Sequence, residues 1–348
     1  TFSFYDLNLV GGTPAAMGES FTSRTDTTWT FGGVRKGPGI RNFVVFANTA
    51  DAVGKADITF FSGANASPVT VTVDLGAFRR GGVDVAGLAQ LPDGEYGVRV
   101  AATVPIVASL SAFSDAERTA SGVVGVPGVG STVGIAPEGL FGRAAESESV
   151  SVLNTTGTTA AVTFSFLFSN GGAYRTTLAV PAGRERSLQV EDLSNFPTDR
   201  PYSVTYESNV PVSMLARSNA YGEAVSGSTA DRAYSLWSFG EGFRPGDDSP
   251  THPGVTEYLR LYTPSTADQT VEITIAYDGV PGFEVFRRTI GGRRVTEVDV
   301  HELVTGSRRA TQQYYSITVK APTPIVAYFG HFDRAFPGAF GTLGTPFG

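Results

Sequence analysis

The chain has 348 residues, of which 41% are hydrophobic and 17% charged, and it contains no cysteine. This length exceeds that of one ordinary domain, so we expect two to four compact units. The missing cysteines exclude disulfides, thiolate metal sites and cysteine nucleophiles. The net charge of -7 disfavours broad binding to nucleic acid, and no apolar run approaches the ~20 residues of a membrane helix, so membrane insertion is not expected.

The N-terminal segment, residues 1–27, is predicted to be a strand and linker that belong to the end of a preceding repeat. Residues 1–10 alternate between apolar and polar side chains, with Phe2 and Phe4 on one face. Residue 1 is Thr, and no basic start followed by an apolar block is present, so we expect a processed mature form or a fragment. The segment aligns with the tail of the second repeat described next. It is thus either a remnant of an upstream copy or a strand that pairs elsewhere.

Three long stretches of the chain read alike, and their predicted boundaries are residues 28–118, 131–225 and 234–335. The anchors that recur include three prolines predicted to begin the last strand of each repeat, namely Pro105, Pro211 and Pro324. Short turns are predicted before that strand at residues 84–88, 189–193 and 299–303. The regular spacing predicts three tandem units of one fold.

Within each repeat, apolar and polar residues alternate with period two, as in Val162, Phe164, Phe166 and Phe168. Polar turns follow every 8 to 12 residues, and no alternation of strands with helices is present. The sequence therefore predicts an all-β protein of three tandem immunoglobulin-like antiparallel β-sandwiches arranged in a rod.

The two tryptophans of the chain stand at the start of the first and third repeats. Trp29, Val133 and Trp237 are separated by 104 residues in both steps, so each is expected to open the first strand of its own sandwich. Large aromatic side chains supply much of the apolar area that a core buries. We interpret the tryptophans as core residues rather than as a ligand platform.

No catalytic constellation is evident. The three histidines, His252, His301 and His331, fall in different contexts, and His301 occupies a position of the repeat that tolerates Ala and Glu. No G-x-S-x-G motif or phosphate-binding loop is present, and the close carboxylate pairs, such as Glu146 with Glu148, are interpreted as solvated faces. We expect no enzymatic activity and no cofactor.

One loop invites comparison with a metal site. Asp247 and Asp248 and the surrounding carbonyls offer oxygen ligands for Ca²⁺, but the spaced pattern of acidic residues is missing, so a polar loop is the preferred interpretation. Two N-glycosylation sequons begin at Asn65 and Asn154 and predict exposed turns.

The motifs resemble the tandem β-sandwich repeats of uncharacterised bacterial secreted and cell-surface proteins. The resemblance is carried by W-x-F-x-E-G at 237–242, LNT at 153–155, VPAGR at 180–184, VDVHEL at 298–303 and PVSMLARSNAY at 211–221. It covers nearly the whole chain and implies an extracellular or cell-surface location in a bacterium. These motifs are architectural, so the resemblance implies no catalytic residues.

The leading hypothesis is an extracellular structural or adhesive protein that acts through contacts with other copies of itself or with surface proteins. The C-terminal segment, residues 336–348, is predicted to be a Phe/Gly-rich tail with more aromatic surface than a free tail exposes. The predicted assembly contacts lie at both ends of the chain: Phe2, Phe4, Phe336, Phe340 and Phe347.

The alternative hypothesis is a carbohydrate-binding or accessory module of a larger surface complex, whose partner would be a cell-wall or extracellular polysaccharide. Exposed aromatic rings would then stack on sugars, and the predicted stacking residues are Phe31, Tyr314 and Tyr315. Binding of a polysaccharide that is lost on Tyr315→Ala would separate the alternative from the leading hypothesis.

Overall fold

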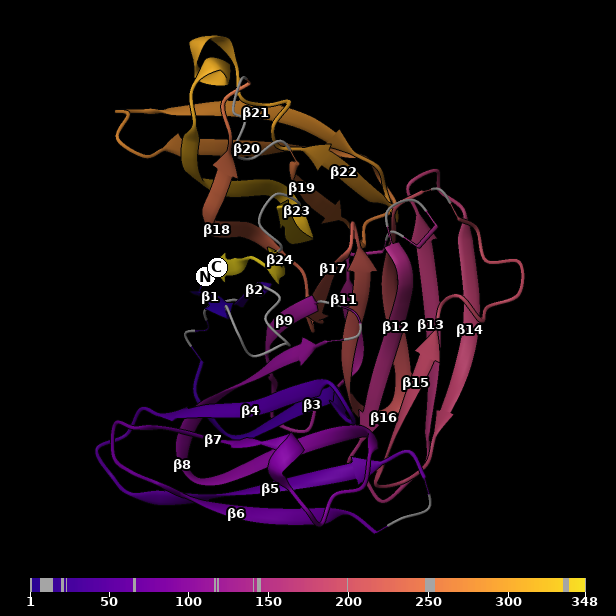
Figure 1. Cartoon of the computed structure of the whole chain (residues 1–348). Helices are drawn as coiled ribbons and strands as arrows, with labels where there is room; N and C mark the ends of the chain where they lie inside the picture. Colours follow the sequence, from indigo (N-terminus) through magenta and orange to yellow (C-terminus); the bar gives the residue numbers. More distant parts are fainter. Residues whose placement is uncertain are drawn as a thin grey trace.

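A computed structural model of the chain contains strands, turns and two short 3₁₀ helices, η1 (Val85–Gly87) and η2 (Gly306–Ala310) (Figure 1). The structure describes residues 2–6, 15–19, 22, 24–64, 67–115, 117, 119–139, 141–142, 145–198, 200–247, 254–333 and 338–347. The side chains of residues 2–6, 15, 16, 19, 223 and 228 lie outside this description. The predicted all-β sandwich class is confirmed.

The first unit is a sandwich of two sheets. Its strands are β3 (Asp26–Lys36), β4 (Ile40–Asn48), β5 (Gly54–Ser62), β6 (Val69–Leu75), β7 (Arg80–Asp84), β8 (Gly94–Ser114), β9 (Thr119–Val124) and β10 (Val126–Pro127). We call the sheet β6-β5-β8-β3-β10 the opening sheet, because it holds the first strand of the unit. We call the sheet β7-β4-β8-β9 the closing sheet, because it holds β9, which follows the long strand β8.

The second unit repeats this plan. Its strands are β11 (Ser131–Ala136), β12 (Ala145–Asn154), β13 (Ala160–Phe168), β14 (Ala173–Val180), β15 (Arg184–Gln189), β16 (Tyr202–Ala220) and β17 (Glu223–Ser228). The opening sheet is β14-β13-β16-β11 and the closing sheet is β15-β12-β16-β17. A bridge between Ile135 and Ala230 takes the place of β10.

The third unit follows with β18 (Tyr234–Arg244), β19 (Val255–Tyr262), β20 (Gln269–Tyr277), β21 (Phe283–Ile290), β22 (Val295–Asp299), β23 (Gln313–Asp333), β24 (Gly338–Leu343) and β25 (Thr345–Phe347). Its opening sheet is β21-β20-β23-β18-β25, and its closing sheet is β22-β19-β23-β24. The segment predicted to be a separate tail therefore contributes the last two strands of this unit. A hairpin of β1 (Phe2–Asp6) and β2 (Ala15–Glu19) joins β24 through a parallel pair with β2.

Side-chain alternation explains why these segments form sandwich strands. In β13, residues 160, 162, 164, 166 and 168 are buried while the intervening ones are exposed or half-buried. Each unit has its own apolar core between its two sheets. The tryptophan prediction is confirmed, since Trp29 and Trp237 are 1% and 2% exposed.

The repeated prolines do not begin strands, which corrects the prediction made from their spacing. Pro105, Pro211 and Pro324 lie inside the long strands β8, β16 and β23. Each long strand pairs with β5, β13 or β20 of the opening sheet before its proline and with β4, β12 or β19 of the closing sheet after it, and residues 103–105 have no partner in β4 or β5. A residue without an N–H is tolerated where the strand changes sheets. Since immunoglobulin sandwiches keep separate ABED and CFG sheets, the shared strand is a different arrangement.

Val133 does not occupy the tryptophan position of the second unit. Trp29 pairs with Val100, Trp237 with Val319, and Gly134 with Tyr206, so Gly134 is the equivalent residue. The Trp29 indole donates to the carbonyl of Ile106, and the Trp237 indole donates to that of Ile325. In the second unit the Tyr206 hydroxyl donates to Val212, and its ring fills the space beside Gly134. A tyrosine from the facing strand thus replaces the tryptophan.

The three units form an arc around a common centre rather than the predicted rod (Figure 1). The strands β2, β9, β17 and β24 meet at this centre, which we call the hub. The strand β9 of the first unit also contacts β24 of the third, and this contact requires the chain to curve back on itself. The hub is the physical reason why the prediction of a rod is wrong.

Candidate functional site

Hydrogen bonds, ion pairs and close backbone approaches join neighbouring units. At the first contact, the opening sheet of the first unit packs on the closing sheet of the second. A Cβ on Gly32 would lie 2.8 Å from the carbonyl oxygen of Ser151, and one on Gly97 would lie 2.6 Å from the Leu153 side chain. Glycine permits this close approach of two sheets. Leu153 is fully buried as a result.

An ion triad bridges the same two units. Arg35 donates two hydrogen bonds to Glu117 over 2.8 and 3.0 Å, and Arg217 of the second unit donates to the same carboxylate. Burial alone raises the pKa of Glu117, but the bonds from Arg35 and the charge of Arg217 outweigh it and lower the pKa to about 2. The triad borders a cavity of about 270 Å³ whose polar lining includes Glu148 and Glu191. Charge-assisted pairs that are mostly removed from water fix geometry between partners.

A second polar cluster lies beside this cavity. The Ser187 hydroxyl lies 2.9 Å from the hydroxyl of Ser151, 2.9 Å from Glu185 and 3.1 Å from Glu95 of the first unit. Burial raises the pKa of Glu185 to about 7, and the nearby charge of Glu95 adds to this effect. One member of the contact therefore titrates near neutral pH.

The contact between the second and third units uses equivalent positions with larger side chains. Arg260 stands where the second unit has Ser151, and Glu297 stands where it has Ser187. Arg260 is 1% exposed, donates to Glu297 over 3.0 Å, and lies over the ring of Tyr258 at 4.4 Å. A salt bridge replaces a pair of serines at this contact.

Glu138 of the second unit faces that arginine. The residue is 7% exposed, and its two carboxylate oxygens have no hydrogen-bonding partner among the described residues, although Tyr328 and Arg260 across the contact act to lower its pKa. Burial raises the pKa of Glu138 to about 7, and the neighbouring Glu148 charge adds to the increase. A buried carboxylate without a full ion pair favours its neutral form.

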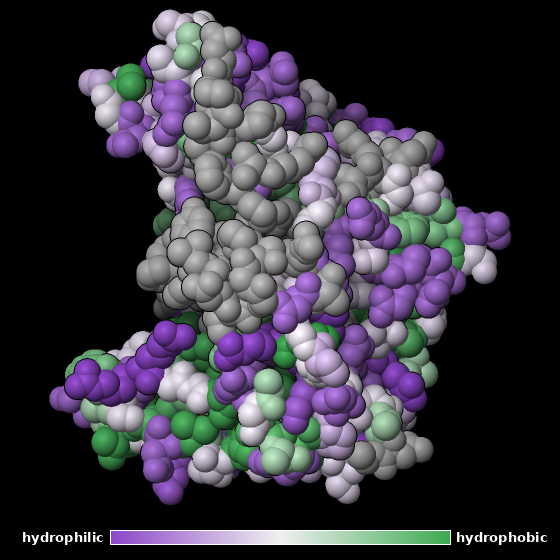
Figure 2. Space-filling view, viewed as in Figure 1, coloured by the Kyte–Doolittle hydropathy of each residue, from purple (hydrophilic) through white to green (hydrophobic). Residues whose placement is uncertain are grey.

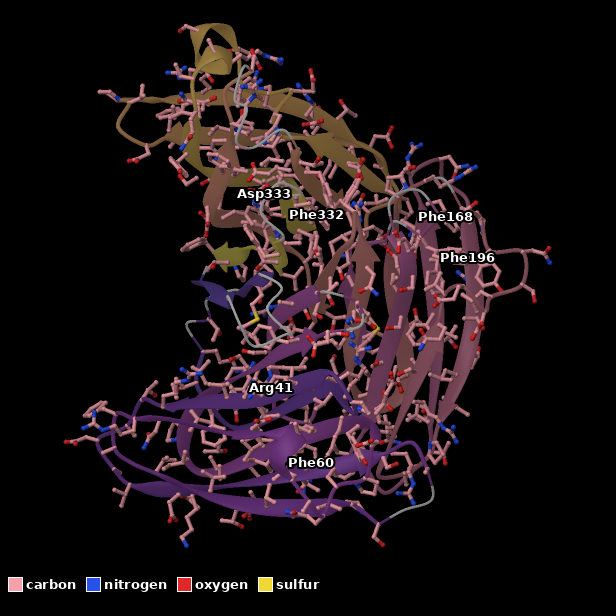
Figure 3. The ribbon with its side chains drawn as sticks, viewed as in Figure 1. Arg41, Phe60, Phe168, Phe196, Phe332 and Asp333 are labelled. Carbon is pink, nitrogen blue, oxygen red and sulfur yellow. The ribbon has the colours of Figure 1, made fainter. Side chains whose placement is uncertain are left out.

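The hub adds further contacts between units. The Ser226 and Ser121 hydroxyls lie 3.0 Å apart, and Tyr221 meets Phe332 edge to face with ring centroids 5.1 Å apart. Phe332 and Asp333 lie on the side of the third unit that faces the hub, whereas Phe168 and Phe196 lie in the second unit (Figure 3). Hydrophobic residues from the second and third units form one continuous cluster at this point.

A buried carboxylate recurs inside two units. Glu148 accepts a hydrogen bond from Tyr202, and Glu257 accepts one from Tyr315. The two glutamates occupy equivalent register positions, and the first unit has the buried Asn42 there. The interpretation of Glu148 as part of a solvated face is therefore wrong, because the side chain accepts bonds from within its own sandwich.

Two of the three histidines meet at Glu257. His331 Nδ1 lies 2.7 Å from Glu257 Oε1, and His301 Nε2 lies 3.5 Å from Oε2. The bonds and charges of His301 and His331 overcome the effect of burial and lower the pKa of Glu257. Burial lowers the pKa of His331, but its bond to Glu257 and the carboxylate charge raise it overall. His301 is thus not a tolerant surface residue, as the sequence suggested.

One signal in the sequence could have revealed this cluster. Glu148 and Glu257 both lie near the start of the second strand of their repeats, and Tyr202 and Tyr315 both lie at or near the start of the long strand. A matched acid and phenol in two repeats indicates a pair that meets in the fold. The arrival of His301 and His331 had no local signal, because they lie in a turn and at the end of a strand.

The predicted stacking residues have different environments. Phe31 and Tyr315 are 1% and 4% exposed, so neither ring can stack on a sugar, and both assignments are wrong. Phe31 belongs to the apolar core of the first unit, and the Tyr315 hydroxyl donates a hydrogen bond to Glu257. Tyr314 is 52% exposed and lies beside Phe243 with ring centroids 5.0 Å apart.

The predicted assembly residues also divide. Phe340 is 6% exposed and stacks on His331 within the third unit, which removes it from any free surface. Phe347 is 52% exposed. Phe2 and Phe4 lie in β1, but their side chains are outside the described part, as is all of Phe336.

The remaining predictions concern loops. Asp247 pairs with Arg244, while Asp248 lies outside the described residues. Within the described ranges, no group of three or more His, Cys, Asp or Glu side chains is arranged to hold a metal ion. Asn154 is fully buried and donates to Val180, so this sequon does not mark an exposed turn, and Asn65 is not described. Neither 3₁₀ helix in the described chain has the length and apolarity to cross a membrane.

The fold and its contacts define a protein of three fused β-sandwich repeats held around a hub. Residues 133–225, which span most of the second unit, match the family described as Anabaena sensory rhodopsin transducer. No curated protein sequence matches the chain significantly.

Among solved structures, the chain is similar to the Thermotoga maritima protein 1070, with 26% identity, a TM-score of 0.24, and coverage of 26% of this chain and 80% of that one. It is also similar to the Anabaena sensory rhodopsin transducer, with 25% identity, a TM-score of 0.24, and coverage of 26% and 91%. A tetra-tandem repeat from the extending region of a large adhesion protein gives 14% identity, a TM-score of 0.16, and coverage of 92% and 73%. Because these TM-scores are low, the fold is argued from the chain's own strand pairing.

Proposed function

We propose that this protein is an extracellular structural or adhesive component of a bacterial surface, which acts through contacts with other copies or surface proteins and not through turnover. The observation that carries the proposal is the construction of the contacts between units. Partly buried ion pairs, such as the Arg35–Glu117–Arg217 triad, join the sandwiches together with glycine-mediated close approaches. Such contacts hold the units in one relative orientation and leave their outer faces available.

Other features support the same role. The match of the second unit to a transducer family is compatible with work done by contact with another protein. Large apolar side chains are exposed in or beside the turns between strands, including Phe78 at 63% between β6 and β7 and Phe283 at 68% at the start of β21. Exposed aromatic residues of this kind are typical anchors of protein–protein interfaces.

The alternative function, binding of a cell-wall or extracellular polysaccharide, is favoured by one observation. Tyr314 is half exposed, and the tilted Phe243 ring packs beside it, which provides an aromatic surface on the third unit. Aromatic rings offer large contact area at low entropic cost.

A pair of matched substitutions separates the two functions, since Phe347 and Tyr314 are equally exposed at 52%. Assembly is followed by analytical ultracentrifugation and electron microscopy, and sugar binding by retention on cell-wall polysaccharide. The structural proposal expects Phe347→Ser to reduce assembly and Tyr314→Ser to leave it intact. The alternative expects Tyr314→Ser to abolish saturable retention. A strict monomer at high concentration that binds no surface component would contradict both.

Deleting whole terminal segments is a poor test, although the sequence suggests it. Removal of residues 333–348 takes away β24 and β25, which pair with β23 and β18. The third unit would lose two sheet edges, so any loss of assembly would be confounded with unfolding. Point substitutions at exposed positions avoid this difficulty.

A further inference from the structure

The hub has four members, although the described chain contains only three sandwiches. The strands β9, β17 and β24 directly follow the long strands β8, β16 and β23 of the three units, and β2 is the fourth member. Around the hub, β2 contacts β9 and β24, and β17 contacts the same two strands. The four strands therefore form a closed cycle, to which each of the three units contributes one strand and the β1–β2 hairpin contributes the fourth.

The β1–β2 hairpin has the register of the hairpin that closes a unit. Residue pairs at the same place are Phe113 with Ala120, Asn219 with Ala224, Phe332 with Ala339, and Tyr5 with Ala16. Two residues after the alanine, Gly18 and Gly341 both make close approaches, with a Cβ on Gly18 meeting Phe340 at 2.8 Å. The β1–β2 hairpin therefore matches the closing hairpins of the three units in register, and β1 corresponds to the ends of the long strands β8, β16 and β23.

Neighbouring units meet by one rule. The closing sheet of each unit packs on the opening sheet of the unit before it, as Leu153 does on Gly97 and Tyr328 does on Glu138. The closing sheets of the second and third units therefore have buried outer faces. The residues on those faces with exposures of 5% or less include Ser151, Leu153, Ser213 and Leu215 in the second unit and Arg260, Tyr262, Val326 and Tyr328 in the third.

The same face of the first unit is open. At the equivalent register positions Val45, Val107 and Ser109 are half-buried and Ala47 is exposed. Arg41 lies on this unit toward the centre of the arc, beside the ring of Phe43 at 5.1 Å (Figure 3). Figure 2 shows hydrophobic residues, in green, at the surface of the first unit. In the described part of the chain, this apolar face is therefore not covered by another sandwich.

The opposite face of the third unit is open as well. Gly32 and Pro137 are buried in the first two units, whereas the equivalent Gly240 is exposed. Gly97 and Ser203 are buried, whereas the equivalent Ser316 is half-buried.

We propose that a fourth β-sandwich of the same repeat, continuous with β1 in the polypeptide, occupies the gap between the third and first units and completes a ring of four. The proposal rests on the register of the β1–β2 hairpin and on the two open faces, and it does not depend on the proposed function. The two faces also specify the chemistry of the occupant. Its closing sheet would meet Glu241, the equivalent of Glu138, with hydrogen-bonding or basic side chains, and its opening sheet would meet the apolar face of Val45 with small residues.

The absence of cysteine from the chain permits a direct test by single-cysteine labelling. Ala47→Cys and Gly240→Cys probe one open face each, and Val53→Cys, at a position 78% exposed, is the matched control. Maleimide reaction rates are measured in the chain of residues 1–348 and in the same variants made with the residues that precede Thr1 in the natural polypeptide.

The proposal expects all three cysteines to react rapidly in residues 1–348. In the longer polypeptide, the reaction rates of Ala47→Cys and Gly240→Cys should fall by about tenfold or more, because labelling then requires local opening. The reaction rate of Val53→Cys should not change. Equal rates in both proteins would overturn the proposal, as would a natural polypeptide that lacks a sandwich before β1. Concentration-dependent protection of residues 1–348 alone would also overturn it, because a second copy would then occupy the gap.

Discussion

The raised pKa of Glu138 predicts that this residue weakens the contact between the second and third units at neutral and alkaline pH. The pKa of the Glu138 carboxyl is near 4.5 in the unfolded chain and about 7 in the folded protein. Between these values the folded state binds more protons than the unfolded state, so stability falls as pH rises. The contribution is fully present below pH 4.5 and lost above about 7. A difference of about 2.5 units corresponds to roughly 3 kcal/mol.

Glu138→Gln tests this reasoning because it keeps the shape of the side chain and removes its titration. Gly227 packs directly on the carboxylate, so a smaller residue would leave a cavity. At pH 8 we expect the variant to unfold at a higher urea concentration than the wild type, with a free energy of unfolding that is larger by up to roughly 3 kcal/mol. At pH 4.5 the two free energies of unfolding should differ little. The stability of the variant should still depend partly on pH, because the pKa of Glu185 is also raised to about 7.

The assay is urea unfolding at pH 4.5, 6 and 8, followed by fluorescence of Trp237, with Trp29→Phe in every protein compared. Glu241→Gln is the matched control, because Glu241 holds the equivalent position in the third unit and is only half-buried. Its substitution should change stability by about 0.5 kcal/mol or less at each pH. An unchanged pH profile in Glu138→Gln, or an equal effect of Glu241→Gln, would refute the assignment.

Three further outcomes are expected. Leu153→Ala removes a fully buried side chain at the contact between the first two units and should cost about 2–5 kcal/mol, with greater separation of these units in small-angle scattering, and an unchanged scattering profile would contradict the contact. Tyr206→Phe leaves the Val212 carbonyl without its hydroxyl donor and should cost about 1–3 kcal/mol in urea, whereas the loss should be absent for the exposed Tyr314→Phe. His331→Gln should destabilise the third unit most between pH 4.5 and 6.5, which are the pKa values of Glu257 and His331 in the unfolded chain. The lowered pKa of Glu257 stabilises the fold above pH 4.5, and the raised pKa of His331 stabilises it fully below pH 6.5. A pH-independent loss in urea midpoints would show that the pair is not charged.

Much of the local structure follows from the sequence. Alternation in segments such as residues 160–168 determines which side chains enter a core, because successive side chains of a strand point to opposite faces. The repeats predict three units of one fold, and the single turns after Val85, Val190 and Val300 recur in all of them as i to i+3 hydrogen bonds. These features depend on neighbours within a few residues or within one repeat.

The arrangement of the units depends on contacts that no local pattern encodes. Gly97 reads as an interruption of a strand, and only the docked units show that it admits Leu153 from 56 residues further along the chain. Similarly, Glu138 follows β11 whereas Arg260 and Tyr328 lie on β19 and β23, and their placement in one polar cluster comes from the docking of two sandwiches. The rod was wrong for the same reason, since periodicity within a strand fixes the inner face of each sandwich but leaves the pairing of outer faces to glycine, charge and shape at distant positions.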